Sequence, residues 1–158
     1  MIQRIQTVYL SLSIIAIALL FFFPIAYFYS ELASLRFYIT GIKNMVPSGG
    51  LPFPVWFAAP LMVADLAVMA LAAVTISLYK DRPRQIKLTN IAVMLNILFV
   101  LALLFIYIPM IEKHTLIKAD YAGTFGIYLP IISLMFLVLA SRSIKRDEKL
   151  VRSSDRLR

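Results

Sequence analysis

The chain has 158 residues, of which 61% are apolar, and its 16 Lys and Arg against 8 Asp and Glu give a formal net charge of +8. This length suits one domain, and the apolar share exceeds that of soluble domains, so the composition favours an integral membrane protein. The absence of Cys excludes disulfides, thiolate nucleophiles and cysteine-ligated metal centres, and a single His, His114, excludes two-histidine haem ligation, so we expect no cofactor.

Four apolar stretches are each close to the length of about 20 residues that a membrane-spanning helix needs. They predict an all-α membrane protein, a four-transmembrane-helix bundle that forms one domain over residues 1–140. A basic tail, residues 141–158, follows it and contains no Gly or Pro, so we expect the last helix to continue into the cytoplasm. The four predicted helices cover residues 8–28, 55–79, 88–108 and 123–140.

Basic residues concentrate on one side of these stretches. That side contains the N-terminus, the loop between the second and third stretches, and the tail. Short segments rich in Lys and Arg stay in the cytoplasm, so we expect both termini to be cytoplasmic. The basic residues on this side are Arg4, Lys80, Arg82, Arg84, Lys87, Arg142, Lys145, Arg146, Lys149, Arg152, Arg156 and Arg158.

The two outer loops contain strand-like sequence. Residues 35–40 are rich in strand formers and roughly alternate, and Gly41 and the turn residues 47–50 follow them. The last outer loop contains a second strand-like piece, residues 115–117. Together these segments predict a small extracytoplasmic sheet or β-hairpin.

Polar residues occur at similar depth in three of the predicted helices. Asp65, Asn96 and Ser133 lie about 13–18 Å from the outer helix ends at ~1.5 Å per residue. A charge near the bilayer centre costs at least ~2.5 kcal/mol, so Asp65 should be paired, protonated or functional. One hypothesis is a proton or cation relay, and the other is an interhelical hydrogen-bonded clamp worth ~0.6 kcal/mol. We favour the clamp because no second ionisable group accompanies Asp65.

The sequence contains no complete catalytic or metal-binding pattern. Glu112, His114 and Asp120 share the last outer loop, but no nucleophile motif accompanies them. A solvated loop is the simpler interpretation. We therefore predict no catalytic, cofactor-binding or metal-ligating residues.

The basic tail supports two interpretations. It can adhere to anionic lipid headgroups, which contributes roughly 1 kcal/mol per Lys or Arg, or it can dock a cytoplasmic partner through Leu150 and Leu157. Nucleic acid is a weaker candidate, because basic charge alone is poor evidence for it. The candidate contact residues are Arg4, Arg84, Lys87, Lys145, Arg146, Leu150, Arg152, Arg156, Leu157 and Arg158.

Three short motifs carry a resemblance to a known family. Residues 1–7 read MIQRIQT, residues 84–88 read RQIKL, and residues 147–158 read DEKLVRSSDRLR. Together they resemble a four-transmembrane-helix inner-membrane protein family of Bacteroidota, which is described as a domain of unknown function. The resemblance implies a multi-pass protein of the bacterial inner membrane. It implies no activity or cofactor, and no site residue.

These observations lead to one functional hypothesis and one alternative. We expect a non-enzymatic accessory or assembly subunit of a larger inner-membrane complex, which docks a membrane-protein partner or a second copy through its cytoplasmic face. The alternative is a small transporter or proton- or cation-conducting protein that uses Asp65. An enzyme ranks third, because too few candidate catalytic groups converge.

Overall fold

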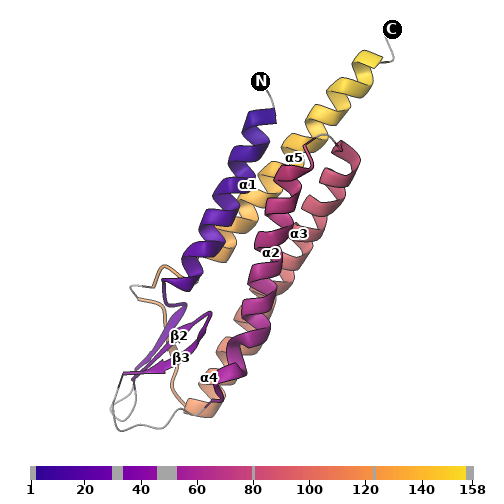
Figure 1. The fold of residues 1–158 in the computed structure, drawn as a ribbon. Helices are drawn as coiled ribbons and strands as arrows, with labels where there is room; N and C mark the ends of the chain where they lie inside the picture. The colour runs from indigo at the N-terminus through magenta and orange to yellow at the C-terminus, as the bar shows by residue number, and fades with distance from the viewer. Residues whose placement is uncertain (1–2, 30–33, 46–52, 80, 123, 156–158) are drawn as a thin grey trace.

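The computed structural model describes residues 3–29, 34–45, 53–79, 81–122 and 124–155. Long helices form a bundle, and a small sheet lies at one end of it, which we call the sheet end (Figure 1). The chain termini lie at the opposite end, which we call the terminal end (Figure 1). The side chains of residues 3, 4, 55 and 151–155 fall outside this description.

The helices alternate in direction between the two ends of the bundle. Proline occupies the first turn of α3, where its missing N–H leaves no helical hydrogen bond unmade. The helical elements are α1 (Gln3–Ala18), η1 (Leu19–Phe21), η2 (Val55–Ala58), α2 (Ala59–Ser77), α3 (Arg82–Ala102), the π-helical η3 (Leu103–Tyr107), α4 (Ile108–Thr115) and α5 (Leu129–Asp155).

The helix that contains α3, η3 and α4 is uninterrupted but changes its winding. It runs over 34 residues, Arg82–Thr115, and its π turn lies just before Pro109. Proline cannot donate to the carbonyl four residues earlier, so the wider π turn is accommodated at this point. The helix ends at Leu116, which adopts the left-handed conformation with φ 57°.

The sheet has four antiparallel strands in the order β3-β2-β1-β4. Leu35 and Phe37 of β2 are buried, whereas Arg36 and Tyr38 between them point the other way, as strand geometry requires. The sheet therefore has one apolar face. The strands are β1 (Ala26–Tyr29), β2 (Ser34–Tyr38), β3 (Gly41–Asn44) and β4 (Ala119–Asp120).

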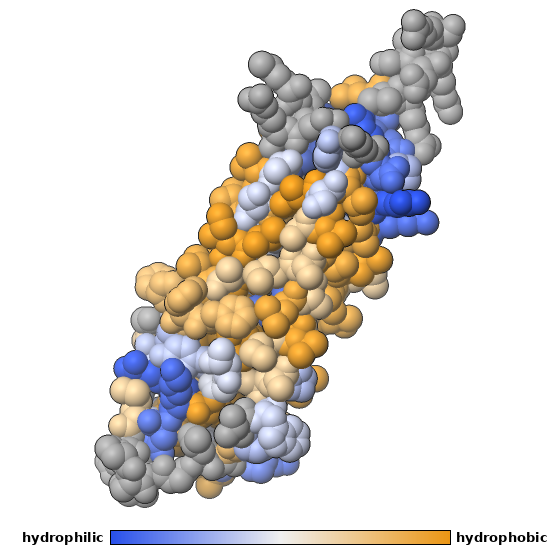
Figure 2. Space-filling view, viewed as in Figure 1, coloured by the Kyte–Doolittle hydropathy of each residue, from blue (hydrophilic) through white to orange (hydrophobic). Residues whose placement is uncertain are grey.

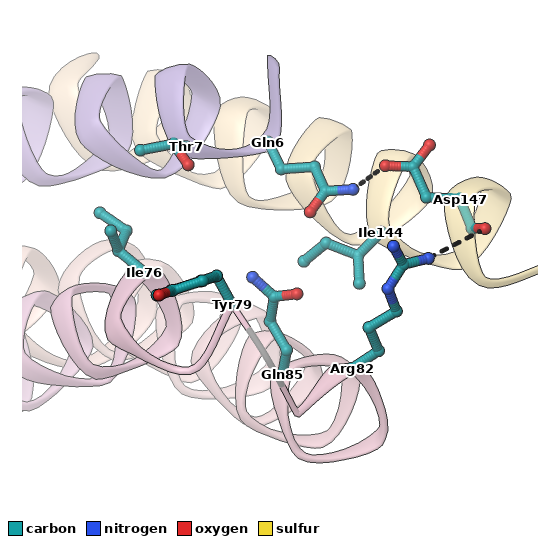
Figure 3. A pocket seen from close by; sticks show the side chains of 8 residues that line it. All are labelled: Gln6, Thr7, Ile76, Tyr79, Arg82, Gln85, Ile144 and Asp147. Atoms are coloured by element: carbon teal, nitrogen blue, oxygen red, sulfur yellow. Dashed lines mark hydrogen bonds between the residues drawn. The ribbon is translucent and has the colours of Figure 1, made fainter. Parts of the chain in front are cut away.

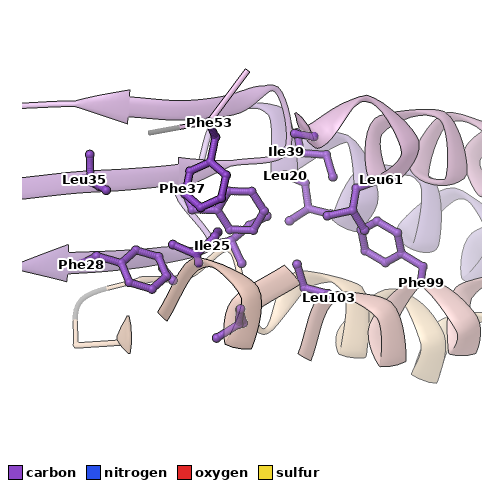
Figure 4. Close-up of a cluster of buried hydrophobic side chains, with 14 of the residues drawn as sticks. Leu20, Ile25, Phe28, Leu35, Phe37, Ile39, Phe53, Leu61, Phe99 and Leu103 are labelled. Atoms are coloured by element: carbon purple, nitrogen blue, oxygen red, sulfur yellow. The ribbon is translucent and has the colours of Figure 1, made fainter. Parts of the chain in front are cut away.

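The apolar face of the sheet packs against the sheet end of the bundle. Phe28 and Phe37 from the strands join Leu103 and Ile111 from the long helix in one buried cluster (Figure 4). A second buried cluster follows the bundle toward the terminal end. It includes Ala72, Ala92 and Ala140, whose small side chains let the helices approach closely.

The predicted all-α four-transmembrane-helix bundle is wrong. The structure contains a four-stranded antiparallel sheet, and within the described residues only two helices, Trp56–Ser77 and Arg82–Thr115, are long and apolar enough to cross a membrane. The remaining apolar helix, Ile5–Phe21, is shorter. α5 is apolar only in its first half, and its second half is rich in charge.

The difference arises because apolar composition does not separate a helix from a buried strand. The apolar run at residues 8–28 predicts one helix. In the structure the helical part ends at Phe21, and Ala26–Tyr29 form strand β1. Pro24 separates the two, and the aromatic residues after it favour a strand. Where the outer loops predict a small sheet or hairpin, the structure has a four-stranded sheet.

Smaller differences occur in the loops. Within residues 115–117, Thr115 ends α4 and no strand forms, whereas β4 follows at Ala119–Asp120. The helix predicted from residue 123 begins at Leu129. The predicted turn at residues 47–50 lies outside the described residues.

Candidate functional site

A polar cluster lies inside the bundle where α1, α3 and α5 meet. The hydroxyl oxygens of Ser13 and Ser133 are 2.8 Å apart, and Nδ2 of Asn96 donates to Oγ of Ser133 over 3.1 Å. All three side chains are buried. We call Ser13, Asn96 and Ser133 the mid-bundle cluster. The structure therefore brings together Asn96 and Ser133 and adds Ser13, which the sequence analysis did not name.

Asp65 is buried in the same part of the bundle but has no hydrogen-bond partner among the described residues. Its side chain is 0% exposed, and both carboxylate oxygens are unpartnered, as is Oδ1 of Asn96. From the helix rise, Asp65 lies about 18 Å from the end of α2 and Asn96 about 21 Å from the start of α3. Buried acceptors without donors are costly, so a proton or cation would supply the missing partner.

A second polar cluster lies at the terminal end, where three helices meet. Nε2 of Gln6 in α1 donates to Oδ2 of Asp147 in α5, and Arg82 in α3 donates to the backbone carbonyl of Asp147 over 3.3 Å. Gln85 donates through Nε2 to the carbonyl of Thr75 over 3.2 Å. Gln6, Gln85 and Asp147 are each more than nine-tenths buried. We call Gln6, Arg82, Gln85 and Asp147 the terminal cluster.

The terminal cluster lines a cavity of about 420 Å³. Its polar side chains point toward a common space, and Ile76 and Ile144 supply apolar wall (Figure 3). The cavity therefore combines one guanidinium, one carboxylate and two amides with aliphatic surface. This composition is typical of sites for small molecules that carry both charge and an apolar part.

This cluster could not be identified from the sequence alone. Gln6 lies in the motif of residues 1–7 and Asp147 in the basic tail, yet both side chains are buried. One signal was present, since Gln6 is followed at helical spacing by Leu10, Ser13 and Ile17, which are all buried. The pairing of α1 with α5 was not visible in the local pattern.

The predicted cytoplasmic contact residues that the structure describes lie at the terminal end. Arg84 pairs with Asp81 over 3.3 Å, and Lys87, Lys145 and Arg146 are exposed. Leu150 is 50% exposed. The side chains of Arg4 and Arg152 lie outside the described part, and so do the whole residues Arg156, Leu157 and Arg158.

The acidic and histidine residues near the sheet end each contact a nearby residue. Glu112 accepts from the amide of Ala119, Asp120 accepts from that of Ala122, and His114 lies edge-on to Phe53. Burial, and secondarily Glu112, raises the pKa of the nearby Tyr121. Among the described residues, no three acidic or histidine side chains are grouped to hold a metal ion.

Comparison with known proteins identifies a family without an assigned activity. The family model for a domain of unknown function (DUF4293) matches residues 2–157, which is nearly the whole chain. No curated protein and no solved structure matches the chain. The function therefore has to be inferred from the geometry of the molecule.

Proposed function

The chain belongs to the DUF4293 family, and from its geometry we propose that it is a non-enzymatic accessory or assembly subunit of a larger complex in a bacterial inner membrane. The partner in this proposal is a membrane protein with an acidic cytoplasmic surface, which contacts the terminal end. The three motifs that resemble a Bacteroidota inner-membrane family, at residues 1–7, 84–88 and 147–158, support the same location.

The surface of the bundle supports a position within the bilayer. Large apolar side chains point outward along the two long apolar helices, including Val63 at 62%, Met94 at 66% and Phe105 at 72% exposure. They contribute to a continuous apolar band between polar ends (Figure 2). A band of this size on a monomer marks a contact with lipid or protein. Lys and Arg are concentrated at the terminal end, which favours cytoplasmic termini in a multi-pass arrangement.

The observation that carries the docking proposal is the length of α5. It is one helix of 27 residues, Leu129–Asp155, and it extends past the other helices at the terminal end (Figure 1). Near this end, Asp147 of α5 contacts Gln6 in α1 and Arg82 in α3. Eight residues of helix follow, about 12 Å at ~1.5 Å per residue.

The projecting part of α5 has a surface suited to an acidic partner. It contains the exposed Lys149 and the half-exposed apolar Leu150, and the exposed Lys145 and Arg146 lie in the turn just before it. A segment of this length is marginally stable as an isolated helix in water, so continuity with the bundle and a docked surface would both stabilise it. The charge steers the approach of the partner, and burial of Leu150 would contribute ~1.5–3 kcal/mol.

The test is purification from the native membrane in mild detergent, with partners quantified by mass spectrometry. Lys145→Glu/Lys149→Glu should reduce recovery of the partner at least tenfold. The matched control is Lys113→Glu/Lys118→Glu, an equal reversal of two exposed lysines at the sheet end, which should leave recovery unchanged. Recovery of the unaltered protein only as a monomer or self-oligomer, while other complexes survive, would contradict the proposal.

A second candidate function is proton or cation conduction through Asp65. The observation that favours it is the set of unpartnered buried acceptors on Asp65 and Asn96. Asp65→Asn should abolish flux in proteoliposomes while leaving insertion intact, and Asp81→Asn, an exposed carboxylate at the terminal end, is the control. Unchanged flux in the Asp65 variant, or no flux in the unaltered protein, would remove this candidate.

A further inference from the structure

We propose that the cavity at the terminal end binds the headgroup of an aminophospholipid of the phosphatidylethanolamine class. The chemistry recognised is a primary ammonium joined by a short chain to a phosphodiester. The inference rests on the membrane position proposed above, which puts this cavity at the bilayer surface. It does not depend on the docking of a protein partner.

The cavity is preorganised, because its polar side chains are buried and already hydrogen-bonded. Gln6, Gln85 and Asp147 come from three different helices, each is more than nine-tenths buried, and each is already fixed by a hydrogen bond. The volume of about 420 Å³ falls within the ~300–1,000 Å³ of small-molecule pockets. Side chains held in this way need little further ordering when a ligand binds.

The charges in the cavity match the two ends of this headgroup. Arg82 uses one guanidinium nitrogen on the carbonyl of Asp147, and its other N–H groups can donate to phosphate oxygens. Oδ2 of Asp147 accepts a hydrogen bond from Gln6, which leaves Oδ1 to accept a hydrogen bond from the ammonium. Gln85 donates its amide N–H to Thr75, so Oε1 is oriented as a second acceptor. The cavity thus offers cationic donors and anionic acceptors side by side (Figure 3).

The same arrangement disfavours the other common headgroups. A phosphatidylglycerol headgroup has neutral hydroxyl groups in place of the ammonium, so it offers Asp147 weaker donors and no opposite charge. A choline headgroup has no N–H to donate to Asp147 and Gln85. Ile76 and Ile144 in the wall suit the glycerol and first acyl carbons of a lipid, which a soluble phosphoethanolamine lacks.

The test is a lipid titration of the purified full-length protein by native mass spectrometry in maltoside detergent. Phosphatidylethanolamine should bind at least tenfold more tightly than phosphatidylcholine or phosphatidylglycerol of the same acyl chains. Asp147→Asn, which keeps the shape of the side chain, should remove this preference. Arg82→Gln should weaken binding of all three lipids. Arg142→Gln, at an exposed arginine of α5 that does not line the cavity, is the control and should change nothing.

Three results would overturn the proposal. They are equal binding of the three lipids, an unchanged preference in Asp147→Asn, and displacement of the lipid by soluble phosphoethanolamine at the affinity of the lipid itself. Each variant is first shown to be monodisperse with the thermal unfolding of the unaltered protein, and Arg82→Lys supplies a second variant that retains the charge. Recovery of the protein partner is measured in parallel, so that lost lipid preference with a retained partner refutes only this inference.

Discussion

Gln6 in the first helix donates a buried hydrogen bond to the carboxylate of Asp147 in the last, across 141 positions of sequence. This contact joins the first and last helices at the terminal end of the bundle. It also forms part of the cavity wall (Figure 3). One pair of side chains therefore connects the packing of the bundle, the start of the projecting helix and the proposed lipid site.

The Gln6–Asp147 contact should be visible as a coupling free energy. Gln6→Leu leaves a buried carboxylate without its donor and should lower the free energy of unfolding by about 1–3 kcal/mol. Adding Asp147→Leu removes the stranded acceptor, so the double variant should recover most of that loss. Thermal unfolding in detergent of the two single variants and the double variant measures the coupling. Additive losses would show that the two side chains act independently.

Ser133 should contribute more to stability than Ser13. Ser133→Ala removes contacts to both Ser13 and Asn96, whereas Ser13→Ala removes one of them. Interhelical hydrogen bonds within a membrane average ~0.6 kcal/mol, so the expected losses are about 1 and about 0.6 kcal/mol. Ser77→Ala, which loses only a contact within its own helix, is the control. Equal losses at the two sites, measured by the same thermal assay, would argue against Ser133 as the centre of the cluster.

Gly126 should not tolerate a side chain. Its amide donates to the carbonyl of Pro24 over 3.2 Å, and a Cβ at this position would lie 2.7 Å from the carbonyl carbon of Pro24. Gly126→Ala must therefore shift backbone where the chain leaves α1 and approaches α5, at a cost of about 1–3 kcal/mol. Ala122→Leu enlarges an exposed side chain of the same loop and serves as the control. A Gly126→Ala protein as stable as the control would show that this approach is not close.

The proposed orientation can be read by labelling introduced cysteines, because the chain has no native Cys. A cysteine that replaces Arg84 or Lys149 should be protected from an impermeant maleimide added to intact spheroplasts. Cysteine at Lys118, on the sheet side, should react. Lysed cells provide the control, since all three positions are exposed and should label there. The reverse pattern would place the termini outside the cytoplasm.

The strand in the first outer loop could be predicted because its pattern is local. Leu35, Phe37 and Ile39 alternate with polar or aromatic residues, and they face the core in the structure. Strand β1 could not be predicted in this way. Ala26–Tyr29 continue an apolar run from α1, and only pairing with β2 and β4 determines their conformation.

The candidate sites also differ in whether local sequence patterns or long-range packing determine them. The depth of Asn96 and Ser133 along their predicted helices indicated that they lie at a similar level. In the structure, Nδ2 of Asn96 is 3.1 Å from Oγ of Ser133. The terminal cluster depends on how α1 and α5 pack, and no periodicity within either segment contains that relation. Asp147 is an acidic residue in a basic segment, and its burial follows from neighbours that are distant in sequence.

Site-specific photocrosslinking tests the central proposal, docking through the projecting part of α5, most directly. A photoreactive amino acid replaces Leu150, and in a separate variant it replaces Leu116, which is exposed at the sheet end. Irradiation of intact cells should yield one discrete crosslinked protein from position 150, identified by mass spectrometry, and no such product from position 116. Crosslinks to lipid alone at position 150, or the same products from both positions, would contradict the account.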